Sequence, residues 1–252
     1  VLGEDFTISA WILPEETPHS HKAIYAANSS DLAIWFGHTD EGQLRLHVNG
    51  GNYMDSDAGV LNLNELNHVV ASYSEGVAKI YSNGSLVASH EGFSPPHRHS
   101  FNIGREIVDQ NPNQFKGYMF KMDLYDMALT EQEILLINSI DLTYSSVSAS
   151  YLFDETQGEY LIDHSGNANH GLIFGMSDEN WVKNNSGCID LSACNYNEEA
   201  TFDDGSCIYP EENFDCNGDC IVDIDCSGEC AGQLIDDCTG VCGGEAYVDD
   251  CG

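Results

Sequence analysis

The chain has 252 residues, of which 42 are acidic and 8 are lysine or arginine, so its formal net charge is -34. A chain this acidic does not hold a nucleic-acid backbone, because phosphate binding depends on basic side chains. The same charge excludes anionic membrane surfaces, and the longest apolar runs are too short to span a bilayer. We therefore expect neither nucleic acid nor membrane insertion among its interactions.

Charge and cysteine content divide the chain at the same point. Residues 1–187 hold 25 acids and all 8 bases, which leaves -17, and residues 188–252 hold the other 17 acids and no base. All ten cysteines lie between Cys188 and Cys251. The sequence therefore predicts two modules, a domain over 1–175 and an acidic, cysteine-rich stalk over 176–252.

Residues 1–140 are predicted to form short β-strands. Residues 6–12 (FTISAWI), 43–50 (QLRLHVNG) and 117–126 (GYMFKMDLYD) alternate apolar and polar side chains, which is typical of strands with one buried face. Residues 77–89 (VAKIYSNGSLVAS) have two β-prone arms around Asn83-Gly84, the pair favoured in type I′ hairpin turns.

One short helix is predicted after these strands. Thr130 is its expected N-cap, Glu133 completes a capping box, and Ile134, Leu135 and Ile137 supply an apolar face. Many short strands with frequent turns and one helix predict an all-β antiparallel sandwich. Its core is expected to include Phe6, Ile8, Trp11, Leu46, Val69, Ile80, Phe120 and Leu124.

A serine-rich stretch, 141–150, is predicted to connect this region to residues 151–175. The latter contain strand pieces at 151–153 and 171–174 around a polar turn.

The tail contains a short repeat, which occurs as DCNGDC, DCSGEC and DCTGVC. Its cysteines are spaced C-x3-C, whereas zinc sites usually use C-x2-C pairs, often with histidine, and no histidine follows His170. The C-x-x-C motif of thioredoxin-like sites is also missing. An even cysteine count in a small, loop-rich segment predicts disulfides formed in an oxidising compartment, with zinc ligation and reduced thiols as alternatives. Spacing leaves the pairing open among Cys188, Cys194, Cys207, Cys216, Cys220, Cys226, Cys230, Cys238, Cys242 and Cys251.

The first 175 residues resemble the laminin-G-like, concanavalin A-like family of jelly-roll sandwiches. The resemblance is carried, in the family's usual order, by FTISAWI, NHVVASYSEGVAKIYSNGSLVAS, FNIGRE and GYMFKMDLYDMALTEQEI. Two positions depart from the family pattern: Leu66 stands where a tryptophan is common, and Phe120-Lys121 replace an acidic pair. The resemblance implies a concanavalin A-like jelly roll.

Residues 151–175 look like the opening unit of the same family, which has the form Y-x-F-D-E…D-x-S-G-N-x-N-H-G. In the usual order this unit precedes FTISAWI, whereas here it follows. Either the segment returns to complete the first sandwich, which we favour, or it begins a second copy that is cut short.

The tail resembles short repeats that follow such domains in secreted proteins of marine Bacteroidetes-type bacteria. The stretch GCIDLSACNYNEEATFDDGSC and the stretch DCTGVCGGEAYVDDCG carry this likeness. It implies a secreted or cell-surface location, and the chain, which starts at Val1, is expected to be a piece of a longer precursor.

Glycoside hydrolysis is the catalytic possibility to weigh, because glucanases share the sandwich. Retaining enzymes need two carboxyl groups about 5 Å apart, carried in the family as E-x-D-x-x-E. In KMDLYD the first acid is replaced by Lys121, which leaves Asp123 and Asp126. We expect no catalytic residues and no enzyme.

Loop histidines and aromatic residues are candidate ligand-binding groups, the histidines for a metal and the aromatic residues for a sugar. The motifs HSH (19–21) and HRH (97–99) can bind a transition metal, but solvated loops are favoured, and His68 is expected in the core. Trp35, Tyr53 and Phe36 are candidates for stacking on sugars, although LAIWFG favours a core position for Trp35.

Calcium is the predicted cofactor, because hard cations prefer carboxylate and carbonyl oxygens on a tight loop. The stretch NYNEEATFDDGSC offers Asn195, Asn197, Asp203 and Asp204, although Asn and Asp also cap turns. Asp40, Asp55, Asp57 and Asp109 are alternatives in predicted loops of the sandwich.

These features predict a secreted or surface-anchored, lectin-like adhesion module that recognises an extracellular glycan or protein ligand and is stabilised by calcium. One alternative is a structural spacer or fibre subunit that contacts neighbouring copies and has no ligand of its own. Another is an accessory module of a secreted hydrolase.

Overall fold

The structure is a computed structural model that describes most of the chain. The described residues are 2, 4–15, 21–27, 34–49, 52–96, 100–105, 113–139, 142–155, 157–175, 181, 187–200 and 206–247. The chain forms two compact units, Val1–Asn184 and Asn185–Gly252. Among the described residues, no helix has the length and apolarity needed to cross a membrane.

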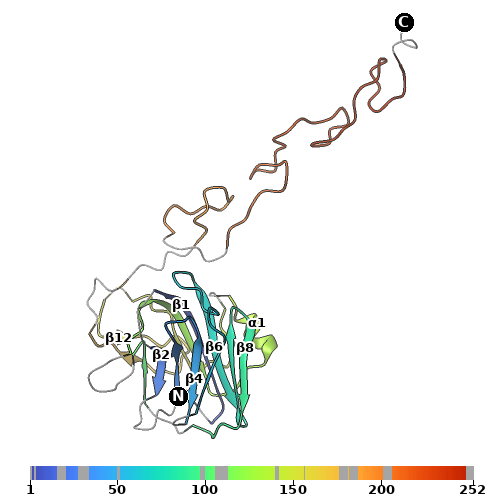
Figure 1. Ribbon diagram of the computed structural model, residues 1–252. Helices are drawn as coiled ribbons and strands as arrows, with labels where there is room; N and C mark the ends of the chain where they lie inside the picture. The colour runs from blue at the N-terminus through green and yellow to red at the C-terminus, as the bar shows by residue number, and fades with distance from the viewer. Residues whose placement is uncertain are drawn as a thin grey trace. The chain divides into compact units, whose positions relative to one another are not determined.

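The first unit is an antiparallel β-sandwich, so the predicted all-β jelly-roll class is confirmed (Figure 1). The larger sheet has the order β11 (Ala149–Tyr151), β10 (Gly117–Tyr125), β1 (Phe6–Pro14), β6 (Asn67–Ser74), β7 (Val77–Ser82), β8 (Ser85–Glu91). The second has the order β5 (Tyr53–Asp55), β4 (Leu44–Val48), β3 (Ile34–His38), β2 (Lys22–Ala27), β9 (Phe101–Ile103). A short ribbon pairs β12 (Tyr160–Leu161) with β13 (Gly171–Leu172).

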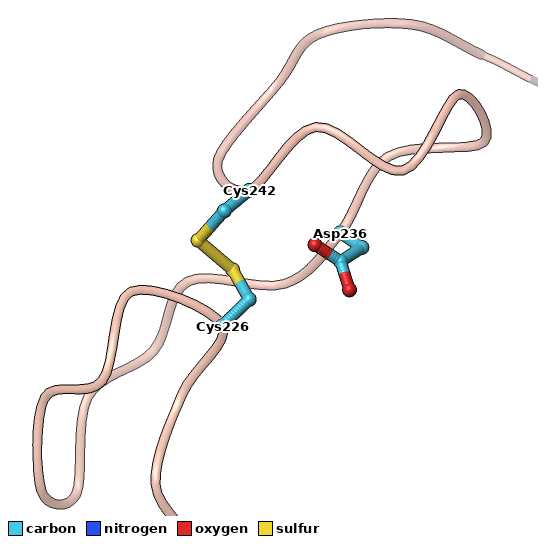
Figure 2. Close-up of side chains that lie close together, drawn as sticks. All are labelled: Cys226, Asp236 and Cys242. Atoms are coloured by element: carbon cyan, nitrogen blue, oxygen red, sulfur yellow. A yellow bond between two sulfur atoms is a disulfide. The ribbon is translucent and has the colours of Figure 1, made fainter.

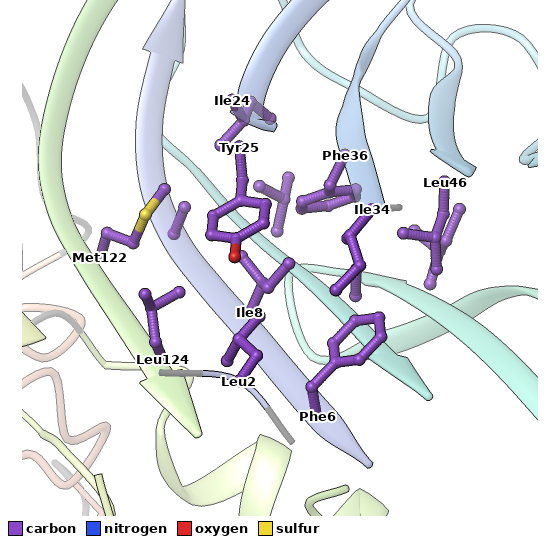
Figure 3. Close-up of a cluster of buried hydrophobic side chains, with 14 of the residues drawn as sticks. Leu2, Phe6, Ile8, Ile24, Tyr25, Ile34, Phe36, Leu46, Met122 and Leu124 are labelled. Carbon is purple, nitrogen blue, oxygen red and sulfur yellow. The ribbon is translucent and has the colours of Figure 1, made fainter. Parts of the chain in front are cut away.

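The core lies between the two sheets. Figure 3 shows it from Phe6 and Ile8 on β1 across to Phe36 on β3 and Leu46 on β4. Seven of the eight predicted core residues are buried. Trp11 is the exception, because the alternation of β1 places it on the outward face with Thr7 and Ser9, where it is half-buried and stacks on His68 with ring centroids 4.7 Å apart.

Local sequence signals explain the hairpin and the helix. Asn83 and Gly84 both have positive φ, 49° and 79°, and link paired strands β7 and β8, which confirms the predicted two-residue turn. Helix α1 (Glu131–Leu136) has the predicted capping box between Thr130 and Glu133. Its apolar face was partly mispredicted, since Leu135 is 59% exposed while Ile134 is buried.

The outward face of the larger sheet is polar and is covered by the chain that follows β10. Thr7 Oγ1 donates to Met127 O and accepts from Leu129 N, both at 2.9 Å. His68 contacts Ser9 at 2.8 Å and Asn138 at 3.0 Å, and its burial lowers its pKa to about 4.

A buried ion pair lies on the same outward face. Lys121 Nζ is 3.5 Å from Asp123 Oδ2 and donates to Leu142 O. The Asp123 carboxylate also accepts from Ser150 Oγ at 2.6 Å and Thr143 Oγ1 at 3.1 Å. Residues 142–150, predicted to be a connector, therefore form part of the layer that satisfies these buried groups.

Residues 151–175 pack on the sandwich that precedes them. Strand β11 pairs antiparallel with β10 at the edge of the larger sheet. Tyr151 and Leu161 are buried in the main core, and Ile173 packs against it. The segment thus extends the first sandwich.

The second unit is held together by disulfides. They join Cys188 to Cys207, Cys194 to Cys216, Cys220 to Cys230, and Cys226 to Cys242. Cys238 is disulfide-bonded as well, and Cys251 lies outside the described residues. The predicted disulfide-rich segment is confirmed, and bonded cysteines cannot be zinc ligands or free thiols.

Each D-C-x-G-x-C repeat folds into the same small hairpin around its aspartate. In the second repeat, Asp225 Oδ1 accepts from the backbone N–H groups of Ser227 (2.9 Å) and Glu229 (3.0 Å). Gly228, with φ 91°, makes the turn. Asp215 and Asp237 accept the corresponding bonds in the other repeats. The carboxylates that recur in this tail therefore organise turns.

Two glycines leave room for a further bond in the later repeats. Asp225 Oδ2 accepts from Leu234 N at 3.2 Å, and a Cβ placed on Gly232 would collide with that oxygen. Gly244 stands in the same relation to Asp237. In the first repeat Val222 occupies this position, and no glycine is needed there.

Hydrogen bonding lowers the pKa of these aspartates. Bonds from Ser227 and from backbone N–H groups lower the pKa of Asp225 to about 2, and Thr239 with backbone N–H groups does the same for Asp237. A lowered folded-state pKa means that the stabilisation is present above the ordinary value of 3.8. It is lost as pH falls toward 2.

Reduction should leave the sandwich folded, because all ten cysteines belong to the second unit. The three tryptophans, Trp11, Trp35 and Trp181, all lie in the first unit and report on it alone. We expect the thermal transition followed by tryptophan fluorescence to be the same with and without a phosphine reductant. A reductant that abolishes this transition would contradict the separation of the two units.

Gly232→Ala should disturb the second repeat, because the new methyl group displaces the Asp225 carboxylate. We expect the variant to lose the bond between Asp225 and Leu234 N and to be less stable than the natural chain. After oxidative refolding, peptide mapping of the unreduced protein should show less of the Cys220–Cys230 and Cys226–Cys242 pairs. Val222→Ala, at the corresponding position of the first repeat, is the control, and equal pairing in both variants would show that the glycine is not required.

Candidate ligand-binding face

Asp123 and Asp126, the two acids left in the family's catalytic motif, have structural roles. The carboxylate of Asp123 is buried beside Lys121, and burial raises its pKa. Asp126, which is exposed just after the strand, accepts from Ser148 Oγ at 3.1 Å. The pair of carboxyl groups that flanks a scissile bond in glycosidases is not formed by these residues.

The outward face of the five-stranded sheet carries a different set of side chains. The register aligns Asn102 (β9), Ala26 (β2), Trp35 (β3), His47 (β4) and Tyr53 (β5) in one row across all five strands. The rings of Trp35 and His47 meet edge to face at 5.6 Å, and those of His47 and Tyr53 lie 5.1 Å apart. This aromatic row ends in Tyr53, which is 52% exposed.

A charged row runs beside the aromatic row. Gly37, Arg45 and Asp55 are aligned on β3, β4 and β5. The Arg45 guanidinium donates to both carboxylate oxygens of Asp55, at 2.5 and 2.6 Å, which raises its pKa. Its Cζ also lies 4.4 Å from the centroid of the Tyr53 ring. The fork of Arg45 is thus held rigidly next to an exposed aromatic face.

Small residues allow the indole of Trp35 to lie low on this sheet. A Cβ on Gly37 would collide with the backbone oxygen of Lys22 and lie 2.7 Å from Trp35 Cη2, so only glycine fits there. Ala23 and Ala26 form a buried cluster with Trp35, which is 3% exposed. The tight packing explains why this tryptophan is buried although it lies on the outward face.

Two polar atoms of the aromatic row have no hydrogen-bond partner among the described residues. They are Trp35 Nε1 and His47 Nδ1, and both are buried. Burial and the nearby Arg45 lower the pKa of His47 to about 4, so its imidazole is neutral at physiological pH. An indole N–H can donate to a hydroxyl group, and a neutral imidazole can donate to or accept from one.

We name Trp35, Arg45, His47, Tyr53 and Asp55 the outer-sheet face. From the sequence, Tyr53 and Trp35 were candidates, and the burial favoured for Trp35 is confirmed. The prediction that Phe36 could stack on a sugar is wrong, since this side chain is fully buried in the core. Arg45 and His47 were missed, although both occupy the polar positions of the alternating strand LRLHV.

The predicted calcium residues are only partly within the described chain. Asn195 Oδ1 accepts from Ile208 N at 2.7 Å and Asn197 Oδ1 from Glu199 N at 3.0 Å, while Asp203 and Asp204 lie outside it. The calcium loop therefore stays a prediction.

Among the sandwich alternatives for calcium, Asp40 and Asp57 are exposed. Both oxygens of Asp55 are occupied by Arg45, and Asp109 lies outside the described residues. Of the histidine motif at 19–21 only His21 is described, and its Nε2 lies 2.5 Å from Arg45 Nη1. The motif at 97–99 lies outside the described residues.

A cluster in the tail has the composition of a metal site but not its chemistry. Cys226, Asp236 and Cys242 place ligand atoms within 4.8 Å of one another. Figure 2 shows that the two sulfur atoms are bonded to each other. A disulfide offers no thiolate, so this cluster cannot hold a metal as cysteinate sites do.

Several solved structures are similar to this chain. A candidate carbohydrate-binding protein from Bacteroides ovatus ATCC 8483 has a TM-score of 0.55 and 21% identity, over 68% of this chain and 52% of its own. The chain thus spans about half the length of that relative. Ruminococcus gnavus IT-sialidase CBM40, bound to α2,3-sialyllactose, has a TM-score of 0.49 and 13% identity, over 55% of this chain and 84% of its own. Domain 4 of the Geobacillus stearothermophilus arabinanase AbnA, in complex with arabinotriose, has a TM-score of 0.43 and 20% identity, over 54% and 66%.

Family comparison agrees with the observed sandwich. No curated protein matches the sequence. A laminin G family described as the Concanavalin A-like lectin/glucanases superfamily matches residues 1–135, which is more than half of the 252 residues. The chain therefore belongs to the Concanavalin A-like lectin/glucanases superfamily.

Proposed function

We propose that the sandwich is an extracellular carbohydrate-binding module and that the outer-sheet face binds the sugar. The observation that carries the proposal is the exposed Tyr53 ring held beside the Arg45–Asp55 pair. Ligand sites combine aromatic surface with a few fixed polar groups. A sugar ring offers C–H groups that pack on an aromatic face and hydroxyl groups that bond to charged side chains.

The rigidity of the face supports this role. Its residues lie on three neighbouring strands, and the Arg45 side chain is fixed by two hydrogen bonds. Groups held in place before binding lose less entropy when a ligand arrives. The same fold occurs in the B. ovatus protein named for carbohydrate binding, and the proposal extends that role to this chain.

The second unit is proposed to serve as a covalently braced stalk. Its hairpins repeat with the same aspartate turn, and disulfides link one repeat to the next. Disulfides of this density form in oxidising compartments, which supports a secreted or cell-surface location. This favours the structural alternative for the tail while leaving ligand recognition to the sandwich.

Calcium is proposed to stabilise the tail, because 17 acids and no base lie in 188–252. Repulsion among these acids is only partly screened at physiological salt.

Tyr53→Ala should weaken glycan binding at least about fivefold, since aromatic residues of binding sites commonly contribute over 1 kcal/mol to binding. A glycan array identifies the sugars retained by the whole chain, and affinity electrophoresis then compares the variants. Tyr160→Ala is the matched control, because Tyr160 is also exposed, at 57%, but lies on β12. Equal binding by the two variants, or no glycan retained by the natural chain, would refute the proposal.

Calcium should raise the protease resistance and the melting temperature of the tail. Binding to the folded state alone stabilises by about 2.7 kcal/mol when calcium is about a hundredfold above its Kd. The measurement compares calcium with chelator at matched ionic strength. Asp203→Asn and Asp204→Asn should reduce the difference, whereas Asp219→Asn should not. Identical curves in calcium and in chelator would show that the acids serve only solubility.

A further inference from the structure

Three potential metal ligands gather in the segment that follows β11. The carboxylate oxygens of Asp154 and Glu155 and an imidazole nitrogen of His164 all lie within 4.8 Å of one another. His164 Nε2 is 3.7 Å from Asp154 Oδ1. None of these residues belongs to the outer-sheet face or to the predicted calcium loop.

Backbone geometry directs the two carboxylates toward the histidine. Phe153, immediately before them, has a φ of 51°, which is rare for an aromatic residue and marks a constrained turn. Glu155 Oε1 accepts from Ile162 N at 2.6 Å, which ties the acid to the strand that leads to His164. The ligand-bearing stretches are therefore fixed to each other without help from a metal.

His164 is held from its other side by a buried turn. The backbone N–H of His164 donates to Ser150 O at 2.7 Å. The neighbouring Asp163, 5% exposed, accepts from the N–H groups of Ser150, Ser165 and Asn169. The imidazole thus projects from a turn that is anchored by hydrogen bonds to β11 and within itself.

One oxygen at this cluster lacks a partner. Glu155 Oε2 is buried, and no described group donates to it. A buried carboxylate oxygen without a hydrogen bond is costly, so its occurrence in a folded protein calls for an explanation. A bound cation supplies the missing positive partner.

We propose that Asp154, Glu155 and His164 bind one divalent transition-metal ion, with zinc as the preferred ion. Imidazole nitrogen suits zinc and its neighbours, whereas calcium and magnesium take oxygen ligands. Zinc bonds of about 2.0–2.2 Å place tetrahedral ligands roughly 3.3–3.5 Å apart. The 3.7 Å between His164 Nε2 and Asp154 Oδ1 exceeds this slightly, and all ligand atoms lie within 4.8 Å of one another, so rotation of the side chains is needed to close the site around the ion.

The ion would join the stretch after β11 to the turn that carries His164. It adds a crosslink at the edge of the sandwich where disulfides are lacking, since every cysteine lies in 188–252. The competing explanation is an ordinary ion pair between protonated His164 and Asp154, which needs no third residue. Because Glu155 is a ligand in the metal site but takes no part in that ion pair, its substitution distinguishes the two explanations.

The test titrates metal-stripped full-length chain with zinc by calorimetry. Other histidines of the chain can also bind zinc. The quantity compared is therefore the number of zinc equivalents that each substitution removes. We expect one equivalent to disappear in His164→Ala and to remain in His90→Ala, a control at another exposed histidine. Glu155→Gln and Asp154→Asn should each weaken that equivalent at least tenfold. About 1 mM calcium, which fills extracellular calcium modules, should not displace it.

A site-specific measurement accompanies the titration. Zinc should slow modification of His164 by diethyl pyrocarbonate, followed by mass spectrometry, while His90 reacts at an unchanged rate. Tryptophan fluorescence melting verifies that each variant is folded, and the isosteric Glu155→Gln keeps its Ile162 bond acceptor. Equal zinc equivalents in His164→Ala and His90→Ala would overturn the site. Full zinc affinity in Glu155→Gln would show that Glu155 is not a ligand and would overturn the three-residue site.

Discussion

Satisfying the polar side chains on the outward face of the larger sheet is the constraint on which the rest of the sandwich depends. Thr7, His68, Lys121 and Asp123 lie on this face and are buried. Groups buried without hydrogen bonds cost roughly 1–3 kcal/mol each, and an unpaired charge costs more. Each of the four side chains has at least one partner in residues 127–150, which include α1. The path of the chain after β10 is therefore dictated by polar groups as much as by the apolar side of α1.

The two units are stabilised by different interactions. The sandwich buries a large apolar core between its sheets, and none of its residues is a cysteine. In the described part of the tail only Cys188 and Ala193 are buried apolar residues. A segment that buries so little needs covalent crosslinks to stay folded. Cysteines are therefore found only where the apolar core ends.

Local signals in the sequence were enough for the strands and turns but not for the contacts between them. Asn83-Gly84 and Thr130 act within a few residues, so their turn and cap could be read directly. The Arg45–Asp55 pair depends on the register of β4 against β5, which alternation alone does not define. Trp11 was misplaced because an aromatic residue in a strand looks the same on either face of a sheet that is covered on both sides.

The connectivity of the tail limits how far it can be stretched. The loop closed by Cys220–Cys230 overlaps the loop closed by Cys226–Cys242, and Cys188–Cys207 overlaps Cys194–Cys216 in the same way. The shortest covalent route from Cys220 to Cys242 crosses both disulfides and uses only the backbone between Cys226 and Cys230. Tension applied along the chain is then carried by sulfur–sulfur bonds, and unfolding of the repeats releases little hidden length. If the tail serves as the proposed stalk, this connectivity would transmit a pulling force to a bound ligand with little extension.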